Sequence, residues 1–499
     1  MKKLASGYRL IFGYLGIFLV FISVITFLPL VMLIFYPNES SVWWYFAVPG
    51  GASLVIGFLL YFLLLFKKDR ARLGKNQDQL LLVSVWIIAI LICAVPFVLS
   101  GKMTFTESVF ESASGFATIG LTRFKIWDSH VFIFYRSLLL FFGGVGLVLI
   151  ITSTLSDRYG LRLYIAEGHN DKLMPNLTKS ARLILGIYVL YIFLGTVAFI
   201  ISGMSAFDAI NHSIAAIATG GFSSLPGGLM AAGGNATANQ IICCVLMLLG
   251  GTNFLIHLFL ITGKFKRVFK DLEIRFFGVL SIVMIPLFVL SFLFGETRFG
   301  FGESVSYGIF TYISSITTSG FTNLPVSTMA NGFVFNGATM FLIVLMCIVG
   351  GGMGSTAGGC KQYRFALALK SFYWNIRSRS VSKNVYFPNK VYRCGQSKEI
   401  TQGELGEATG YILLYLLTFA VGSFLLMIFG NGQFRLGECM FEFANALSST
   451  GLSCNLTANA NNAMMWVMIL GMFAGRLEII PIYFSFTRVF KDIFRKEID

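Results

Sequence analysis

Long apolar segments separated by short polar or basic stretches run through the whole chain. A transmembrane helix needs about 20 predominantly apolar residues, and these segments reach that length. The first, from Ile11 to Phe35, exceeds a signal-peptide core and has no small-residue cleavage site after it, so we expect a retained spanning helix. Two spans open the chain, and the others follow in pairs. The predicted spans lie near residues 10–36, 43–66, 79–100, 130–153, 180–203, 238–262, 275–295, 334–349 (continuing in broken form to about 375), 407–429 and 462–487.

Between the two spans of each pair lies the same short pattern: Ser or Thr, any residue, Gly, Leu or Phe, then Ser or Thr. Its glycines are Gly120, Gly221, Gly320 and Gly451, so the first three copies are spaced by close to 100 residues. Regular self-similarity of this kind predicts a repeated architecture. We call the three residues that end on each glycine the filter residues. They are Thr118, Ile119, Gly120, Thr219, Gly220, Gly221, Thr318, Ser319, Gly320, Ser449, Thr450 and Gly451.

A short apolar stretch precedes each copy, within the loop segments 105–122, 206–223, 304–322 and 437–453. Thirteen helical residues span ~20 Å, less than the ~30 Å hydrocarbon core, so each stretch predicts a half-membrane helix. Thirteen residues before the glycine, three copies have an acid that would complement the positive end of the helix dipole. The negative ends would then point at the membrane centre and favour a cation there. The residues at this position are Glu107, Asp208, Tyr307 and Glu438.

Composition and charge agree with a polytopic membrane protein. Of the 499 residues 56% are hydrophobic and 12% are charged, whereas a soluble protein has about 25% charged residues. The net charge of +15 reflects orientation rather than nucleic-acid binding, because the basic residues gather in alternate linkers. With the positive-inside rule, both termini are predicted to be cytoplasmic. The basic inner segments are 67–75, 156–182, 264–275, 361–398 and the tail after Arg488.

These patterns predict an all-α polytopic membrane protein with four span–pore-loop–span repeats around one pore and two extra N-terminal transmembrane helices. Irregular backbone at membrane depth is tolerated where it lines a cavity, and four sets of carbonyl oxygens can replace the water shell of a cation. Small residues for close helix packing would explain one such cluster, but not four aligned copies. The predicted parts are the two extra helices in 1–76, repeat 1 in 77–178, repeat 2 in 179–272, repeat 3 with its linker in 273–400, and repeat 4 with the tail in 401–499.

Several motifs in this order resemble the membrane subunit of the Trk/Ktr potassium-uptake family (TrkH, TrkG and KtrB) over essentially the whole chain. The two extra N-terminal spans resemble the TrkH branch. Repeat 1 departs from the family at Ile119, where a Thr is frequent, and the fourth copy is closer to the KtrB and TrkG pattern. The other matching segments are Ala206–Ser213, Leu249–Phe254, Gly351–Lys361 and Gly475–Glu478.

The glycine-rich stretch 350–359, here named the gate loop, interrupts an apolar segment on the cytoplasmic side of the filter. Glycine costs ~1 kcal/mol per residue in a helix, so the helix should break here. A packing face and a nucleotide-binding loop are the alternatives, and the latter lacks a preceding strand. The resemblance implies a movable intramembrane gate. Its residues are Gly350, Gly351, Gly352, Gly354, Ser355, Thr356, Gly358 and Gly359.

Arg476 lies inside the last predicted span, with Glu478 two residues on. A charge at membrane depth is costly and is a functional hypothesis by default. The two interpretations are a structural ion pair and a positive barrier in the permeation path below the filter. Cys439 and Cys454 flank the fourth loop, and a disulfide between them is left open.

The resemblance implies inward potassium permeation, with K⁺ as the transported ion and no organic cofactor, in the inner membrane of a bacterium. It also implies a homodimer with one pore per subunit, docked on a cytosolic ring of nucleotide-binding regulatory subunits (TrkA/KtrA-like). The basic linker 361–398 would suit such docking, or its charges serve orientation alone. No nucleic-acid partner is expected.

Two other functions stay open. One is sodium or poorly selective cation transport within the same family, because selectivity depends on field strength and flexibility as well as residue type. The other is an ion-coupled secondary transporter, which predicts inverted repeats, whereas these repeats share one orientation. The sequence contains no Ser-His-Asp spacing, HExxH, CxxC or P-loop, so an enzyme is not expected.

Overall fold

The protein is helical, and its arrangement is known from a computed structural model that describes residues 4–5, 7–67, 69–70, 77–146, 177–295, 299–325, 335–380 and 389–494. The predicted all-α membrane fold is confirmed. The described residues contain six helices long and apolar enough to cross a membrane, two bent helix pairs that pass the same test, and two shorter apolar helices. Together these coincide with the ten predicted spans, except that residues 147–153 and 334 lie outside the described residues.

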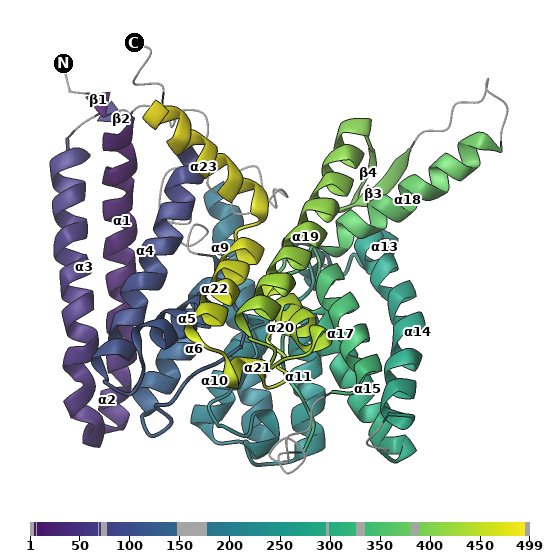
Figure 1. The fold of residues 1–499 in the computed structure, drawn as a ribbon, viewed down its shortest axis with the longest axis horizontal. Coiled ribbons are helices and arrows are strands. Elements are labelled where there is room, and N and C mark those ends of the chain that lie inside the picture. The colour runs from purple at the N-terminus through teal and green to yellow at the C-terminus, as the bar shows by residue number, and fades with distance from the viewer. Residues whose placement is uncertain are drawn as a thin grey trace.

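The two extra N-terminal helices form a tight antiparallel pair at the left edge of Figure 1. They pack so closely that a Cβ added at Gly16 would clash with the backbone at Gly57, and the reverse also holds. A short parallel pairing of β1 with β2 joins their ends. The elements are β1 (Leu4–Ala5), α1 (Tyr8–Phe27), the 3₁₀ helix η1 (Leu28–Val31), α2 (Met32–Phe35), the 3₁₀ helix η2 (Pro37–Val42), α3 (Trp43–Leu64) and β2 (Asp69–Arg70).

The first two repeats each place a short re-entrant helix between two spans. Repeat 1 consists of α4 (Gln77–Leu99), the re-entrant α5 (Phe105–Phe116) and α6 (His130–Val145). Repeat 2 consists of α9 (Leu177–Ile201), the re-entrant α10 (Ala206–Ile217), the 3₁₀ helix η3 (Leu229–Ala231), α11 (Ala236–Gly250), α12 (Phe254–Ile261) and α13 (Phe265–Lys270).

The last two repeats follow the same order, with an antiparallel hairpin, β3–β4, between them. Repeat 3 consists of α14 (Leu272–Leu293), the re-entrant α15 (Phe301–Ile316), α17 (Gly337–Val349) and α18 (Gln362–Arg379). The hairpin strands are β3 (Lys390–Arg393) and β4 (Gln396–Glu399). Repeat 4 consists of α19 (Gln402–Phe429), the re-entrant α20 (Leu436–Ser448), α21 (Leu456–Asn459), α22 (Asn462–Arg476) and α23 (Ile479–Phe494).

Two spans predicted as continuous are sharply bent in the structure. The segment 238–262 divides into α11 and α12, which meet at 109°. Two consecutive glycines end α11, and the side chain of Asn253 caps α12 by accepting from the Leu255 N–H at 2.8 Å. The segment 462–487 divides into α22 and α23 at 100°. Glu478 lies between them in a left-handed conformation, with φ of 60°.

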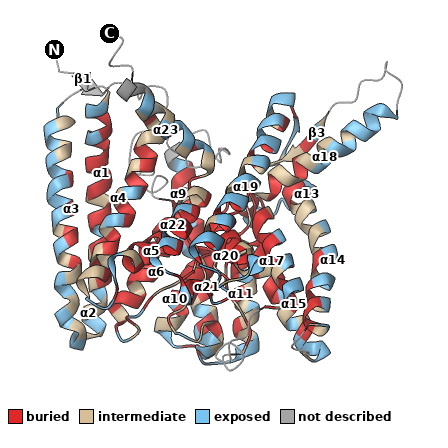
Figure 2. Cartoon of the chain, in the orientation of Figure 1, coloured by how far each residue is buried: buried red, intermediate tan, exposed pale blue. Residues whose placement is uncertain are grey.

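The four re-entrant helices gather in the lower half of Figure 1, surrounded by the longer helices. Figure 2 shows buried residues concentrated in this centre. Along the outer helices α3 and α14, exposed side chains are largely apolar, for example Phe58, Leu63 and Ile282. Exposed apolar flanks around a buried centre that contains polar residues fit a protein surrounded by lipid.

Candidate functional site

The four filter segments meet in a closed ring. A Cβ built on each motif glycine would collide with a carbonyl oxygen of the next segment, so only glycine fits at this approach. The contacts run from repeat 1 to 2, 3, 4 and back to 1. They join Gly120 to the Gly220 oxygen, Gly221 to the Ser319 oxygen, Gly320 to the Thr450 oxygen, and Gly451 to the Ile119 oxygen.

Every filter segment begins and ends in the left-handed backbone region. The first residues, Thr118, Thr219, Thr318 and Ser449, have φ of 52°, 51°, 52° and 59°. The four glycines have φ between 63° and 95°. Positive φ is rare for a β-branched residue, so its recurrence in three threonines is strain held by the surrounding structure.

The same backbone hydrogen bond supports all four segments. The N–H of the residue before the glycine donates to the carbonyl six residues before the glycine, on the re-entrant helix. This bond ties each segment to the negative end of its helix and leaves the filter carbonyls themselves unused by it. The bonds are Ile119 to Ser114 at 2.9 Å, Gly220 to Ala215 at 2.8 Å, Ser319 to Ser314 at 2.8 Å and Thr450 to Asn445 at 3.0 Å.

Side-chain support for the segments differs among the repeats. Six residues before the glycine, Ser114 and Ser314 donate to the carbonyls of Leu121 (2.6 Å) and Phe321 (2.7 Å). In repeat 4 the Asn445 side chain accepts from the Leu452 N–H at 3.0 Å. Repeat 2 has Ala215 at this position, which cannot form such a bond.

A second support comes from the position nine residues before the glycine, which the sequence analysis missed. Glu111, His212 and Glu442 contact the hydroxyl groups of Thr122 (2.9 Å), Ser223 (3.0 Å) and Ser453 (2.6 Å), each two residues after its glycine. Repeat 3 has Thr311 there. Aligning the four copies on their glycines puts these residues in one column, and that column was the available signal. It accounts for the last Ser or Thr of the pattern in three of the four repeats.

The re-entrant helices are capped at their outer ends by acids. In repeat 1 Thr104 and Glu107 form a capping box. Burial raises the pKa of the Glu107 carboxyl, but Lys125, the Thr104 N–H and Arg123 lower it more, to about 2. In repeats 2 and 4 Asp208 and Glu438 lie in the first helical turn, as predicted.

The prediction that repeat 3 lacks an acid at its helix start needs correction. The helix α15 is longer than the other three re-entrant helices, so Tyr307 does not lie at its start. Glu303 occupies the first turn and accepts from the Gly300 N–H at 3.0 Å. The alignment on glycine missed it because it assumed equal helix lengths.

The gate loop lies against the first residues of the filter segments. The Gly358 N–H donates to the Thr318 hydroxyl at 2.7 Å, and the Thr219 hydroxyl donates to that of Thr356 at 3.2 Å. Thr356 in turn bonds the carbonyls of Ile217 and Gly250, both at 2.9 Å. The buried hydroxyl groups of Thr118 and Ser449 have no hydrogen-bond partner among the described residues.

Arg476 connects the gate loop to repeat 1. Its Nη1 donates to the Thr356 carbonyl at 3.0 Å, and its Nη2 donates to the Gly143 carbonyl on α6. Glu478 forms an ion pair with Arg364 at 2.9 Å. A cavity of ≈ 40 Å³ lies beside this contact, lined among others by Lys361 and Arg476.

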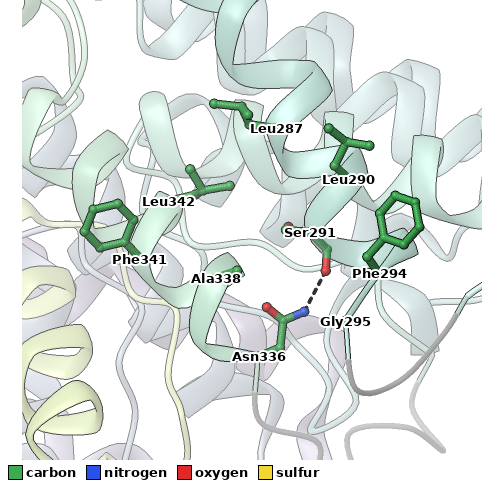
Figure 3. A pocket seen from close by; sticks show the side chains of 9 residues that line it. All are labelled: Leu287, Leu290, Ser291, Phe294, Gly295, Asn336, Ala338, Phe341 and Leu342. Carbon is green, nitrogen blue, oxygen red and sulfur yellow. Dashed lines mark hydrogen bonds between the residues drawn. The ribbon is translucent and has the colours of Figure 1, made fainter.

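Another hollow, of ≈ 400 Å³, lies away from the filter between α14 and α17 (Figure 3). Its lining is mostly apolar, including Leu290 and Phe341. The side-chain amide of Asn336 donates to the Ser291 carbonyl at 2.7 Å.

The described residues contain no group of three or more His, Cys, Asp or Glu able to hold a metal ion. Cys439 and Cys454 are free thiols, so the disulfide that the sequence left undecided is not formed between them.

Comparison with known proteins identifies the family. The TrkH family model, described as a cation transport protein, matches residues 52–492. The chain belongs to the TrkH family of cation transport proteins. It is 29% identical to the Trk system potassium uptake protein TrkH of Escherichia coli K12 over 454 residues, 88% of this chain and 90% of that protein. It is 27% identical to the Trk system potassium uptake protein TrkG of the same strain, covering 95% and 96%.

The fold of this TrkH-family chain is also that of a solved relative. The crystal structure of the potassium transporter TrkH from Vibrio parahaemolyticus superimposes with a TM-score of 0.81 at 24% identity, covering 96% of this chain and 98% of that one. The chain is thus a polytopic membrane protein of a cation-transporter family rather than an enzyme, as predicted.

Proposed function

We propose that this chain conducts potassium into the cytoplasm through the ring of four filter segments. The observation that carries the proposal is the closed contact of each motif glycine with a carbonyl of the next segment. Such a ring offers carbonyl oxygens from four directions to a single dehydrated cation. The potassium-uptake relatives support K⁺ as the transported ion. An inside-negative potential supplies ~2.3 kcal/mol per charge per 100 mV for entry.

The ring can attract a cation although the filter segments themselves contain no charged side chain. The segments supply backbone carbonyls, and the helix ends behind them supply negative partial charge. At the inner end, the hydroxyl groups of Thr118 and Ser449 are available as further oxygen ligands. The resemblance to the Trk/Ktr family implies that glycine in all four segments favours potassium over sodium.

Regulation would act at the gate loop, in line with its bonds to Thr318 and Arg476. In the closed state the loop obstructs the inner end of the filter, and the positive charge of Arg476 opposes cation passage. Opening requires the loop to leave Thr318 and Arg476 together. A cytosolic nucleotide-binding ring on the basic linker 361–398 would supply the energy for that movement, in a homodimer with one pore per subunit.

The proposed location is the inner membrane of a bacterium, with both termini in the cytoplasm. Basic residues of the inner linkers support this orientation. In agreement with it, β1 and α23 lie at the same end of the molecule in Figure 1.

Flux of Rb⁺ and Na⁺ into proteoliposomes tests the proposal, with purified chain and an imposed inside-negative potential. We expect Rb⁺ influx that K⁺ inhibits far more strongly than Na⁺ does. Equal inhibition by both ions would favour a poorly selective pathway, and flux that depends on an added solute would favour a secondary transporter. Protein-free vesicles provide the baseline, and Arg476→Ala serves as an opened form if the isolated chain is closed.

A further inference from the structure

A fully buried ion pair lies behind the outer part of the filter in repeat 1. The residues are Glu111 on the re-entrant helix α5 and Arg136 on α6, with side chains 0% and 2% exposed. The Arg136 Nε lies 2.7 Å from the Glu111 Oε1. Burying two charges is costly unless the geometry is good and every polar atom has a partner. The remaining polar atoms of the pair therefore indicate what it holds in place.

The guanidinium of Arg136 joins two neighbouring filter segments. Its Nη2 donates to the Thr122 hydroxyl at 3.1 Å, and its Nη1 donates to the Ser223 carbonyl at 3.2 Å. Thr122 and Ser223 each stand two residues after a motif glycine. The rings of Phe124 and Phe222 lie on the guanidinium with centroids at 4.2 and 4.1 Å. The side chain thus spans the seam between repeats 1 and 2.

Glu111 fixes the same seam from the helix side. Its carboxylate accepts from the Thr122 hydroxyl at 2.9 Å and from the Arg123 N–H at 3.0 Å. The pair therefore holds the outer part of segment 1 through two bonds to the carboxylate and one to the guanidinium. A carboxylate that accepts several hydrogen bonds and faces a guanidinium is rigidly oriented.

Among the residues that the structure describes, repeat 1 alone has this arrangement. Gly143, Gly250 and Gly475 each lie against the carbonyl four residues before the motif glycine, so the equivalent positions seven residues before them are Arg136, Cys243 and Met468. In repeat 4 Glu442 occupies the place of Glu111, and it accepts from Ser453 and the N–H groups of Cys454 and Thr457. The four-repeat ring is therefore chemically asymmetric, with a buried positive charge at one seam.

We propose that Glu111 and Arg136 are positioning residues that set the cation preference of the filter at the seam between repeats 1 and 2. The inference rests on the proposed function. Arg136 sets the spacing of the two segments, and Glu111 both orients the guanidinium and cancels its charge. Without Glu111, a positive charge would remain beside the outer entrance and oppose cation entry. Without Arg136, the two segments would lose their shared donor.

The experiment compares Glu111→Gln, Arg136→Gln and the double variant in proteoliposomes by Rb⁺ uptake competed with Na⁺. We expect Glu111→Gln to raise the apparent KM for Rb⁺ by about tenfold, because the charge of Arg136 is uncompensated. We expect Arg136→Gln to lower Rb⁺ over Na⁺ discrimination. In the double variant the apparent KM should return most of the way to the wild-type value, because no net charge remains and the introduced amide oxygen on α5 still offers an acceptor. Its Rb⁺ over Na⁺ discrimination should stay low. Lys102→Gln, in the exposed Lys102–Asp128 pair of the same repeat (2.6 Å), should match wild type.

The outcomes separate positioning from folding. An unchanged apparent KM in monodisperse Glu111→Gln, or a double variant no better than that single variant, would overturn the charge-cancelling role. Thr122→Val removes the hydroxyl that both residues hold without altering either charge, so it tests the seam even if the charge variants fail to fold. Retained discrimination in Thr122→Val would overturn the positioning role. If neither the wild-type chain nor Arg476→Ala conducts Rb⁺, the proposed function is overturned as well.

Discussion

At the scale of single residues, the filter depends on close approach and on strain. Each motif glycine lies where a side chain would enter the neighbouring segment, and the residue two before it is held at positive φ. Strained backbone persists only where the surrounding structure determines it. The bond to the re-entrant helix and the supports at Glu111, His212 and Glu442 provide that determination.

Gly320→Ser should lower Rb⁺ over Na⁺ discrimination. The added Cβ would collide with the Thr450 carbonyl, so the carbonyl must move and the ring must change its spacing. Gly302→Ser is the matched control, because Gly302 is in the same repeat and a Cβ there has no atom within 4 Å. Competition of Na⁺ with Rb⁺ uptake measures the effect. Equal discrimination in the two variants would contradict the assignment of the filter.

At the scale of elements, helix breaks define the inner side of the filter. α11 stops at its glycines, α17 stops at Gly350, and α22 stops before Glu478. The α11 break and the gate loop satisfy each other's backbone groups, as when the Gly352 N–H donates to the Gly251 carbonyl at 2.9 Å. The gate loop is therefore held by individual hydrogen bonds of about 0.5–1.5 kcal/mol each rather than by a helix, which suits the movement proposed for it.

Arg476→Ala should raise basal Rb⁺ flux in the absence of any cytosolic protein. The substitution removes the bonds to the Thr356 and Gly143 carbonyls and removes a positive charge near the inner end of the filter. Deleting about half of the gate loop should have the same effect. Lys266→Ala, an exposed cation on α13, controls for charge loss. Flux at or below the wild-type level in both folded variants would show that the loop does not obstruct the pore.

Glu273 should hold the gate loop from the other side. Its Oε1 accepts from the Met353 N–H at 3.1 Å. Asp271, two residues before Glu273, caps α14. Its carboxylate also accepts from the Cys394 N–H of the β3–β4 hairpin at 2.9 Å. Glu273→Ala should therefore raise basal Rb⁺ flux, whereas Glu273→Gln keeps a side-chain oxygen acceptor and should stay close to wild type. If the Gln variant leaks as much as the Ala variant, then charge rather than this hydrogen bond matters.

At the scale of the whole molecule, the four repeats close a ring that no single repeat can form. Contacts pass from repeat to repeat, and the second helix of one repeat supports the segment of the next, as Arg136 does for Ser223. The basic residues gather in the segments that the sequence predicts to be cytoplasmic, as orientation in a membrane requires. If the proposed regulatory ring docks on the linker 361–398, charge complementarity with its basic residues would set orientation more than affinity.

Charge reversal at three exposed residues of this linker should weaken co-purification of a regulatory ring. The variant combines Arg377→Glu, Arg379→Glu and Lys390→Glu. Nucleotide-dependent Rb⁺ flux should fall with it, while membrane insertion is unchanged. The same reversal at Lys266 and Lys270 of α13 and at Lys264, which precedes it, is the matched control. Retained binding and nucleotide response in the linker variant would place the docking surface elsewhere.

The sequence by itself determined the number and order of the spans, the four half-length helices and the residues of the filter segments. Hydropathy, positive-inside charge and glycine spacing are local properties, and each is readable without knowing which segments meet. The domain boundaries and the roles of the filter and gate residues stay predictions.

Only the tertiary structure decided the ring order of the segments, the contact of the gate loop with Thr318, and the bends near Gly251 and Glu478. It also revealed Glu303 as the cap of α15 and paired Glu111 with Arg136. Arg136 and Ser223 are 87 residues apart, and nothing in the local pattern around either residue indicates the other. Such contacts depend on how the repeats pack against one another, because the partners of a buried charge are the groups that lie close to it in the folded chain, not those near it in the sequence.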